Sequence, residues 1–196
     1  MSLTNYAELI SAVERWIKRA DLNSQIPDFI SITENKLSRV LRTAQQQTQV
    51  IANAAFPIAI PGDLQDVIAL SVLVGARYKS LEYLPGNKVN NSKGTAFGYS
   101  VLNNKFILEP ASENAIDYKL DYYAKIPALN EINTTNWLLT KYPGVYLYGA
   151  LIQASLYMVD DERIGVWKAQ YEEEINLINL DNNALAARGS LAVRAR

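Results

Sequence analysis

Apolar residues near the N-terminus recur at intervals of three and four, the spacing that places side chains on one face of a helix. Between residues 4 and 20 this stripe consists of Tyr6, Leu9, Ile10, Val13, Trp16 and Ile17. Asn5 followed by Glu8 resembles a capping box, in which each side chain satisfies a free backbone N–H of the first turn. A second stripe begins near Pro27, a residue suited to a first helical turn, and continues to about Arg42. Residues 1–44 are therefore predicted to form a helical hairpin.

The pattern changes at about Gln45, where helical spacing gives way to short apolar runs bounded by turn residues. We expect strands near residues 56–60, 67–74, 78–83 and 116–122, and a hairpin that turns at Asn103-Asn104. Pro57 and Pro61 favour a sheet edge, because proline cannot donate to a ladder. The segment 85–98 is rich in Gly, Asn and Lys and is predicted to be a mobile loop. Residues 45–130 thus form an inserted antiparallel β-subdomain.

Helical spacing returns over residues 131–183. Pro143 can begin one helix, Asp160-Asp161 interrupts it, and a further helix ends near Asp181 to Asn183. The inward residues of that last helix are predicted to be Ile164, Trp167, Tyr171, Ile175 and Ile178. The element order predicts an α+β fold, a four-helix bundle of two N-terminal and two C-terminal helices with the β-subdomain inserted between the pairs. Residues 184–196 hold few large apolar groups and no acid, so we expect an extended tail.

Composition limits the function without defining it. The chain of 196 residues is 49% hydrophobic and 20% charged, which is typical of a folded protein. A net charge of -1 argues against a protein that grips nucleic acid with its whole surface. No window is long and uncharged enough to predict a membrane span, and the N-terminus does not resemble a signal peptide. We therefore expect the chain to be made and kept in a reducing cytoplasm or in something assembled there, with no membrane partner.

The absence of two residue types excludes most catalytic schemes. With no Cys and no His, the chain lacks thiolate nucleophiles, imidazole bases and the usual zinc ligands. We interpret Asp160-Asp161-Glu162 as a helix start and Glu172-Glu173-Glu174 as a solvated face. No metal and no cofactor are expected. One alternative is a peptidoglycan hydrolase, which needs two carboxyls across a cleft, and Glu109 with Glu113 form only a weak candidate pair.

Large aromatic side chains are concentrated around the stretch "TNWLLTKYPGVYLYGAL". The residues singled out are Trp137, Tyr142, Tyr146, Tyr148 and Tyr157. The tyrosines fall on more than one side of the predicted helix, so the helix should be covered on more than one side. A tyrosine-rich core explains this pattern, but we favour a subunit interface, where tyrosine is enriched. A second alternative places DNA or a tail protein against Lys88 and Lys93 of the 85–98 loop.

The segment "LDYYAKIPALNEINTTNWLLTKYPGVYLYGALIQASLYMVDDERIGVWKAQYEEEINLIN" resembles the C-terminal half of the head-to-tail adaptor proteins of short-tailed phages. The opening "YAEL" and "IPDFI" helices are also similar to that family. The resemblance implies a virion structural protein without catalytic residues, assembled as a ring of twelve copies around the DNA channel. Its partners would be the portal protein, tail hub or nozzle proteins, and genomic DNA that passes without sequence recognition. It also implies a portal-binding C-terminal tail, here represented by Leu185, Arg188, Leu191, Val193, Arg194 and Arg196.

Overall fold

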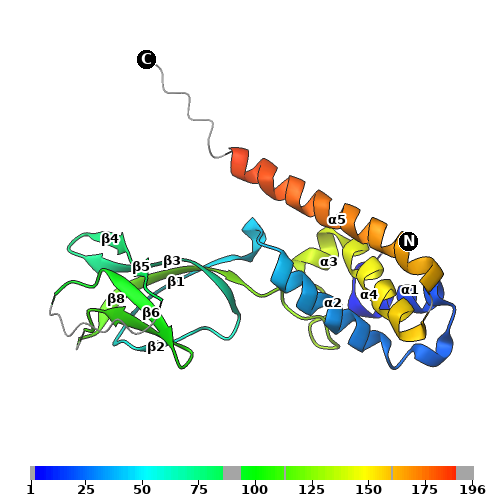
Figure 1. Cartoon of the computed structure of the whole chain (residues 1–196), viewed down its shortest axis with the longest axis horizontal. Helices are drawn as coiled ribbons and strands as arrows, with labels where there is room; N and C mark the ends of the chain where they lie inside the picture. The colour runs from blue at the N-terminus through cyan, green and yellow to red at the C-terminus, as the bar shows by residue number, and fades with distance from the viewer. Residues whose placement is uncertain (1–2, 86–93, 113, 160, 189–196) are drawn as a thin grey trace, which may run out of the picture. The chain divides into compact units, whose positions relative to one another are not determined.

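The computed structural model describes residues 3–85, 94–112, 114–159 and 161–188. The chain divides into two compact units (Figure 1). One unit joins Met1–Gln45 to Ile126–Arg196 and is helical, and the other consists of Gln46–Lys125 and contains the strands. The α+β class predicted from the sequence is therefore confirmed.

The helical unit is organised around one central helix, α4. Its helices are α1 (Tyr6–Ile17), α2 (Ile26–Val40), the single-turn α3 (Trp137–Lys141), α4 (Pro143–Met158) and α5 (Asp161–Arg188). The other four helices all pack against α4. As a result, α4 buries residues on every side, including Val145, Tyr146, Ala150 and Leu151. The helices predicted from apolar spacing, Pro27 and Pro143 are confirmed.

Capping at the start of α1 differs slightly from the predicted box. The Asn5 side chain accepts a hydrogen bond from the backbone N–H of Glu8 at 2.9 Å, as expected. The Glu8 carboxylate, however, accepts from the backbone N–H of Thr4 at 2.8 Å and from its hydroxyl at 2.9 Å. The return bond therefore reaches one residue further back than the capping-box pattern implies.

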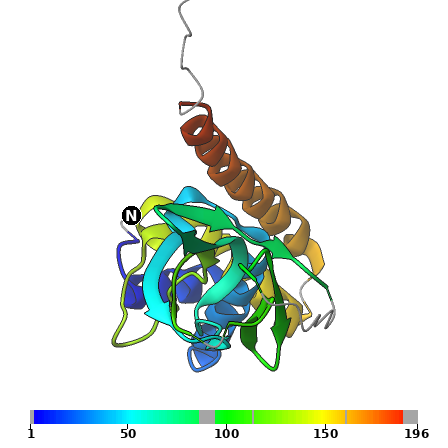
Figure 2. The same cartoon turned by 90° about the vertical axis from the view of Figure 1, so that its left-hand side faces the viewer.

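The helix α5 is longer than predicted. It continues to Arg188, whereas the sequence pattern ended it at Asp181 to Asn183 and made residues 184–196 an extended tail. The stretch that follows contains several alanines, which have the highest helix propensity, so the helix can continue without burying a side chain. Its last turns extend past the other helices of the unit, as both views show (Figures 1 and 2). Residues 189–196 lie outside the described part of the chain.

The strand unit contains two four-stranded sheets among its described residues. The first has the order β1-β8-β3-β4, with β1 (Gln47–Ala54), β8 (Ile116–Ala124), β3 (Leu64–Val74) and β4 (Arg77–Ser80). The second has the order β2-β7-β6-β5, with β2 (Ile58–Ala59), β7 (Lys105–Glu109), β6 (Gly98–Leu102) and β5 (Glu82–Tyr83). A core that includes Leu70, Phe106, Leu108 and Leu120 is buried in this unit.

Two features of the strand unit correct the predicted single antiparallel sheet. The strand β1 was not predicted, because its sequence QTQVIANA has as many polar as apolar residues and only two large apolar ones. The strands β5 and β6 pair in parallel, whereas every other pair is antiparallel. The chain between β5 and β6 is long enough for the crossover that a parallel pair requires. The predicted hairpin is confirmed, since Asn103 and Asn104 both have positive φ between β6 and β7.

The helix α4 approaches its neighbours closely at a glycine. A Cβ at Gly149 would overlap the methyl group of Thr33 on α2 and would lie 3.1 Å from the Tyr171 ring on α5. Thr33 is buried and its hydroxyl is fixed by donating to the carbonyl of Phe29 at 2.8 Å. The missing side chain therefore allows α2 and α5 to lie against the same stretch of α4.

Replacing Gly149 with alanine is expected to destabilise the protein by about 1–3 kcal/mol, because overpacking would force α2 and α4 apart. The matched control is Gly165→Ala in α5, where nothing lies within 4 Å of the added methyl group. That change should leave stability unchanged or raise it by up to about 1 kcal/mol, since alanine favours the helix. Urea unfolding of both variants checks the prediction, and equal effects of the two changes would contradict it.

Candidate interaction surfaces

Tyr146 lies at the centre of a buried polar network in the helical unit. Its hydroxyl donates to Oε1 of Glu34 at 3.4 Å and accepts from Nδ2 of Asn136 at 2.8 Å. Asn136 also donates to the carbonyl of Pro127 at 2.7 Å, and its Oδ1 caps α3 by accepting from the N–H of Leu139 at 2.8 Å. The network thus joins α4 to α2 and to the segment that leads into α3.

Glu34 is the buried acid of this network. Its Oε1 accepts from the backbone N–H of Leu129 at 2.8 Å, and its side chain is almost fully enclosed. Burial raises the pKa of Glu34 to about 7, although the hydrogen bonds from Leu129 and Tyr146 oppose the rise. Burial also raises the pKa of the Tyr146 hydroxyl. Both groups are therefore favoured in their neutral forms inside the helical unit.

Side chains near the end of α5 attach this helix to the rest of the unit. The carboxylate of Asp181 accepts from the hydroxyl of Tyr142 at 2.6 Å and pairs with the ammonium group of Lys141 at 3.0 Å. The next residue, Asn182, accepts from the backbone N–H of Ala44 at 2.9 Å and donates to the carbonyl of Arg42 at 3.2 Å. Beyond this attachment point, residues 183–187 of α5 are exposed.

Three rings join α1, α4 and α5. The Trp16 ring lies 6.1 Å from that of Tyr148, nearly perpendicular to it, and 5.4 Å from that of Trp167. Tyr148 and Trp167 are stacked with centroids 6.2 Å apart. Tyr148 thus has ring partners within its own chain, and such pairs stabilise helix packing by about 0.5–1.5 kcal/mol each.

The aromatic residues that the sequence assigned to a subunit interface lie at different depths in the helical unit. Tyr146 is wholly buried and Tyr142 nearly so, and both belong to the core of the helical unit. Trp137 and Tyr148 are half-buried against that core. Tyr157 remains largely on the surface, at 58% exposure, with its ring 5.6 Å from that of Phe29. The apolarity of α4 on all sides is explained by its central position, so Tyr146 is a core residue.

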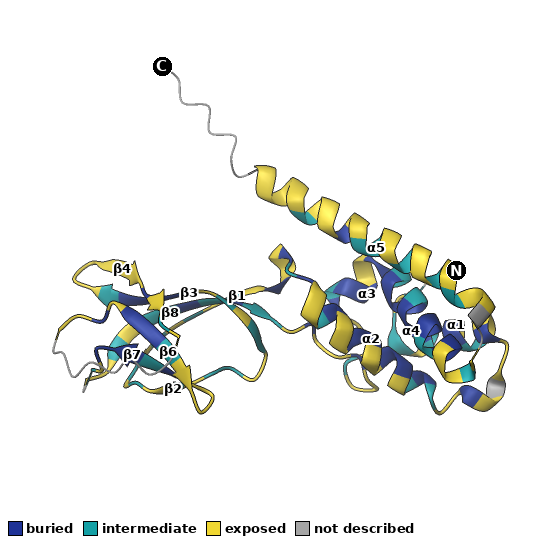
Figure 3. Ribbon diagram, in the orientation of Figure 1, coloured by how far each residue is buried: buried dark blue, intermediate teal, exposed yellow. Residues whose placement is uncertain are grey.

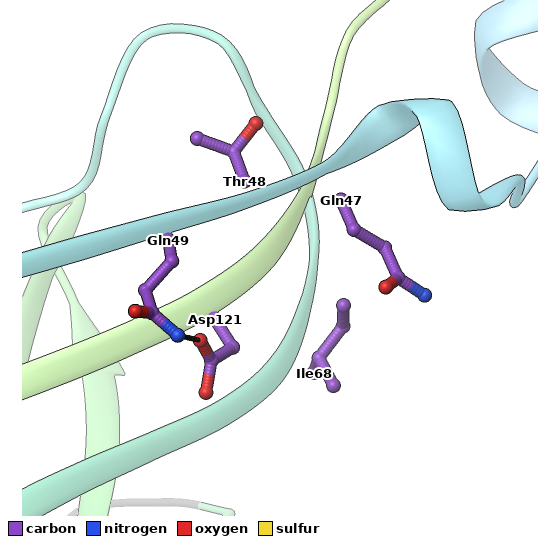
Figure 4. Close-up of a pocket in the computed structure, with 5 residues that line it drawn as sticks. All are labelled: Gln47, Thr48, Gln49, Ile68 and Asp121. Atoms are coloured by element: carbon purple, nitrogen blue, oxygen red, sulfur yellow. Dashed lines mark hydrogen bonds between the residues drawn. The ribbon is translucent and has the colours of Figure 1, made fainter. Parts of the chain in front are cut away.

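A polar cavity of about 270 Å³ lies on the first sheet of the strand unit, between β1, β3 and β8 (Figure 4). It is lined by Gln47, Thr48, Gln49, Ile68 and Asp121. The side-chain amide of Gln49 donates to Asp121 at 2.7 Å, and Lys119 pairs with the same carboxylate at 3.1 Å. Asp121, the acid among these lining residues, is therefore already engaged by a neighbouring amide and an ammonium group.

The remaining sequence candidates are acidic residues and the lysines of the 85–98 loop. Glu109 is buried at the end of β7, and its proposed partner Glu113 lies outside the described residues. Asp161 begins α5, in agreement with the interpretation of the acidic cluster as a helix start. Lys88 and Lys93 also lie outside the described residues. Within the described ranges, no group of three or more acidic residues could hold a metal ion, and no helix is long and apolar enough to cross a membrane.

The buried core of the helical unit is thus formed by residues of one chain. Comparison with protein families gives a match over residues 4–195 to the model described as SU10 adaptor protein. The chain belongs to the SU10 adaptor protein family, and it is accordingly a structural adaptor protein of bacteriophage. The comparison with curated proteins gives no match. The resemblance found in the sequence is confirmed at the level of the family.

The neutral state of Glu34 makes stability depend on pH. Its pKa is about 7 in the folded chain against an ordinary value of 4.5, so the folded chain binds more protons between these values and loses stability as pH rises. Relative to Glu34→Gln, the wild-type free energy of unfolding should fall by on the order of 2–3 kcal/mol from pH 4.5 to pH 8. Urea unfolding at several pH values measures this difference. The control Glu172→Gln changes an exposed glutamate and should keep the wild-type slope. Parallel curves for wild type and Glu34→Gln would contradict the assignment.

Proposed function

We propose that the chain is a head-to-tail adaptor that forms a ring, of twelve copies, below the portal, joins the capsid to the tail and surrounds the DNA channel. The observation that carries the proposal is the match to the adaptor family over residues 4–195. The proposed ring and the proposed partners, portal and tail proteins, are inferred from the resemblance of the C-terminal half to head-to-tail adaptors. In this proposal the function is mechanical, and the virion is where it is performed.

The proposal assigns portal binding to residues 184–196. Three properties support it. The attachment of α5 through Asp181 and Asn182 leaves the following turns exposed, with Leu185 at 42% exposure. The segment carries three arginines and no acid, so it suits an acidic or polar surface on a partner. Its first turns are helical up to Arg188, so the proposed tail begins as a helix.

The strand unit and the helical unit have separate roles in this proposal. The helical unit, with its core around α4, provides the ring. The inserted strand unit is proposed to face the tail proteins, with Lys88 and Lys93 as candidate contacts for tail or DNA. A net charge of -1 supports passage of DNA without a strong grip, since each cationic contact to phosphate adds salt-dependent affinity.

Deletion of residues 185–196 tests the portal assignment. The shortened chain should keep its unfolding free energy within about 0.5 kcal/mol, because residues 185–187, which it loses, are exposed. Its capture by immobilised portal protein should fall to the background level. The control Lys79→Glu changes an exposed cation on β4 and should leave capture intact. If the shortened chain binds portal as well as the full chain, the tail assignment is wrong.

The number of adaptor chains in the proposed ring can be measured separately. Native mass spectrometry of the purified chain with portal protein should show twelve adaptor chains per portal ring. A complex with a single adaptor chain, or with adaptor chains that contact only portal, would contradict the ring.

A further inference from the structure

A groove runs along the helical unit between α2 and α5, with α4 as its floor. It consists of two adjoining hollows of about 270 and 320 Å³, which share Tyr171 and Glu172 of α5. From α2, Thr33, Lys36 and Val40 line the groove at intervals of three and four residues. The floor is formed by Gly149 and Ile152 of α4. We name this feature the α2–α5 groove.

The groove is suited to an amphipathic helix. Its interior offers Ile152, the Tyr171 ring and Ile175, and Val40 on its wall is 64% exposed. Because Gly149 has no side chain, α2 and α5 can both approach α4 at the floor of the groove. The groove is apolar inside, has polar rims and is about two helical turns long. In helix-in-groove recognition, an amphipathic helix lays its apolar face into a groove of this kind.

A row of apolar side chains lies on a different face of α5. Val166, Leu177 and Leu180 are 59%, 48% and 64% exposed, and Ala184 continues the row at the next turn. Their spacing places them on one side of the helix, away from Tyr171 and Ile178, which face α4 and the core. The outer surface of α5 is exposed along its length (Figure 3). We name these four residues the α5 row, and an exposed apolar row of this kind is typical of a contact surface.

We propose that the α5 row of one copy docks in the α2–α5 groove of the next copy, and that this contact builds the ring. The inference rests on the proposed ring and specifies its interface. Charge favours this occupant. The groove carries Lys36 and Lys168 with one acid, Glu172, and is net positive. Glu173 lies in the α5 row between Val166 and Leu177, so it brings a negative charge to the cationic rim.

The placement of the two surfaces also fits a ring. The row and the groove lie on different faces of the same helix, so one copy cannot satisfy both with a single partner in a two-fold arrangement. The contact is therefore head-to-tail, and all rows and grooves are filled only when the chain of copies closes. Both surfaces belong to the helical unit, so the contact does not require the strand unit to take part.

Cross-linking tests the contact directly, because the chain has no native cysteine. A full-length Leu180→Cys chain is mixed with a full-length Val40→Cys chain, with and without portal protein, and treated with a short bismaleimide. We expect a cross-linked pair that contains one chain of each kind, in a yield about tenfold above that of either variant alone. The control pair combines Leu180→Cys with Ile132→Cys, a position that is 96% exposed and lies outside both surfaces.

Charge reversal supplies a second readout that does not depend on cysteine. Glu173→Lys and Lys36→Glu should each weaken association by about tenfold, because each places like charges against each other at the interface. Combined in one chain, the two changes should restore association to near the wild-type level. Both side chains are exposed, so folding should be unaffected, and circular dichroism checks this.

The outcomes distinguish a failure of the proposed interface from a failure of the proposed ring. A ring observed by native mass without the Leu180–Val40 cross-link, or without rescue by the double reversal, overturns this interface and leaves the proposed function intact. Preferred cross-linking of Leu180→Cys to itself overturns the head-to-tail geometry. Cross-linking of Leu180→Cys to portal identifies portal as the occupant and also overturns the inference. Failure to form any ring with portal overturns both the ring and its interface.

Discussion

The close crossing of α2 and α5 over Gly149 of α4 is the contact on which the helical unit depends. A side chain at that position would collide with Thr33 and crowd Tyr171, so the two outer helices could not both lie on α4. With glycine there, α4 buries residues on every side and Tyr146 enters the core. The same crossing leaves α2 and α5 close enough to form the walls of a groove, so core packing and the proposed contact surface have one origin.

Much of the helical unit could be predicted from the sequence, because the signals are local. Apolar spacing, Pro27 and Pro143 located α2 and α4, and Asn5 located the start of α1. The strand unit was less predictable. The strand β1 alternates in burial but carries polar and small residues, so its pattern is weak. The parallel pairing of β5 with β6 joins strands that are separated in the sequence, which no local pattern records.

The sequence could not distinguish aromatic residues buried within the chain from those at a subunit interface. The apolar character of α4 on all sides correctly indicated burial on more than one side, but the pattern cannot say whether the cover comes from the same chain or another. The structure assigns Tyr146 to its own core through Glu34 and Asn136. The row of Val166, Leu177 and Leu180 was not predicted, because the apolar stripe from Ile164 to Ile178 already explains α5 as a helix with one buried face. A second apolar spacing on the opposite face was the signal that could have identified it.

The helix α5 connects the two associations proposed for this adaptor. It carries the apolar row, and the same helix continues past its attachment at Asp181 and Asn182 into the proposed portal-binding segment. In the proposed assembly, a neighbour that holds the row also restricts the motion of the helix end, so less ordering entropy remains to be lost on portal binding. Linkage makes the effect reciprocal, because a helix end held by portal equally favours docking of the row in the next groove. A weak contact between copies can then close a ring on the portal without closing one in solution.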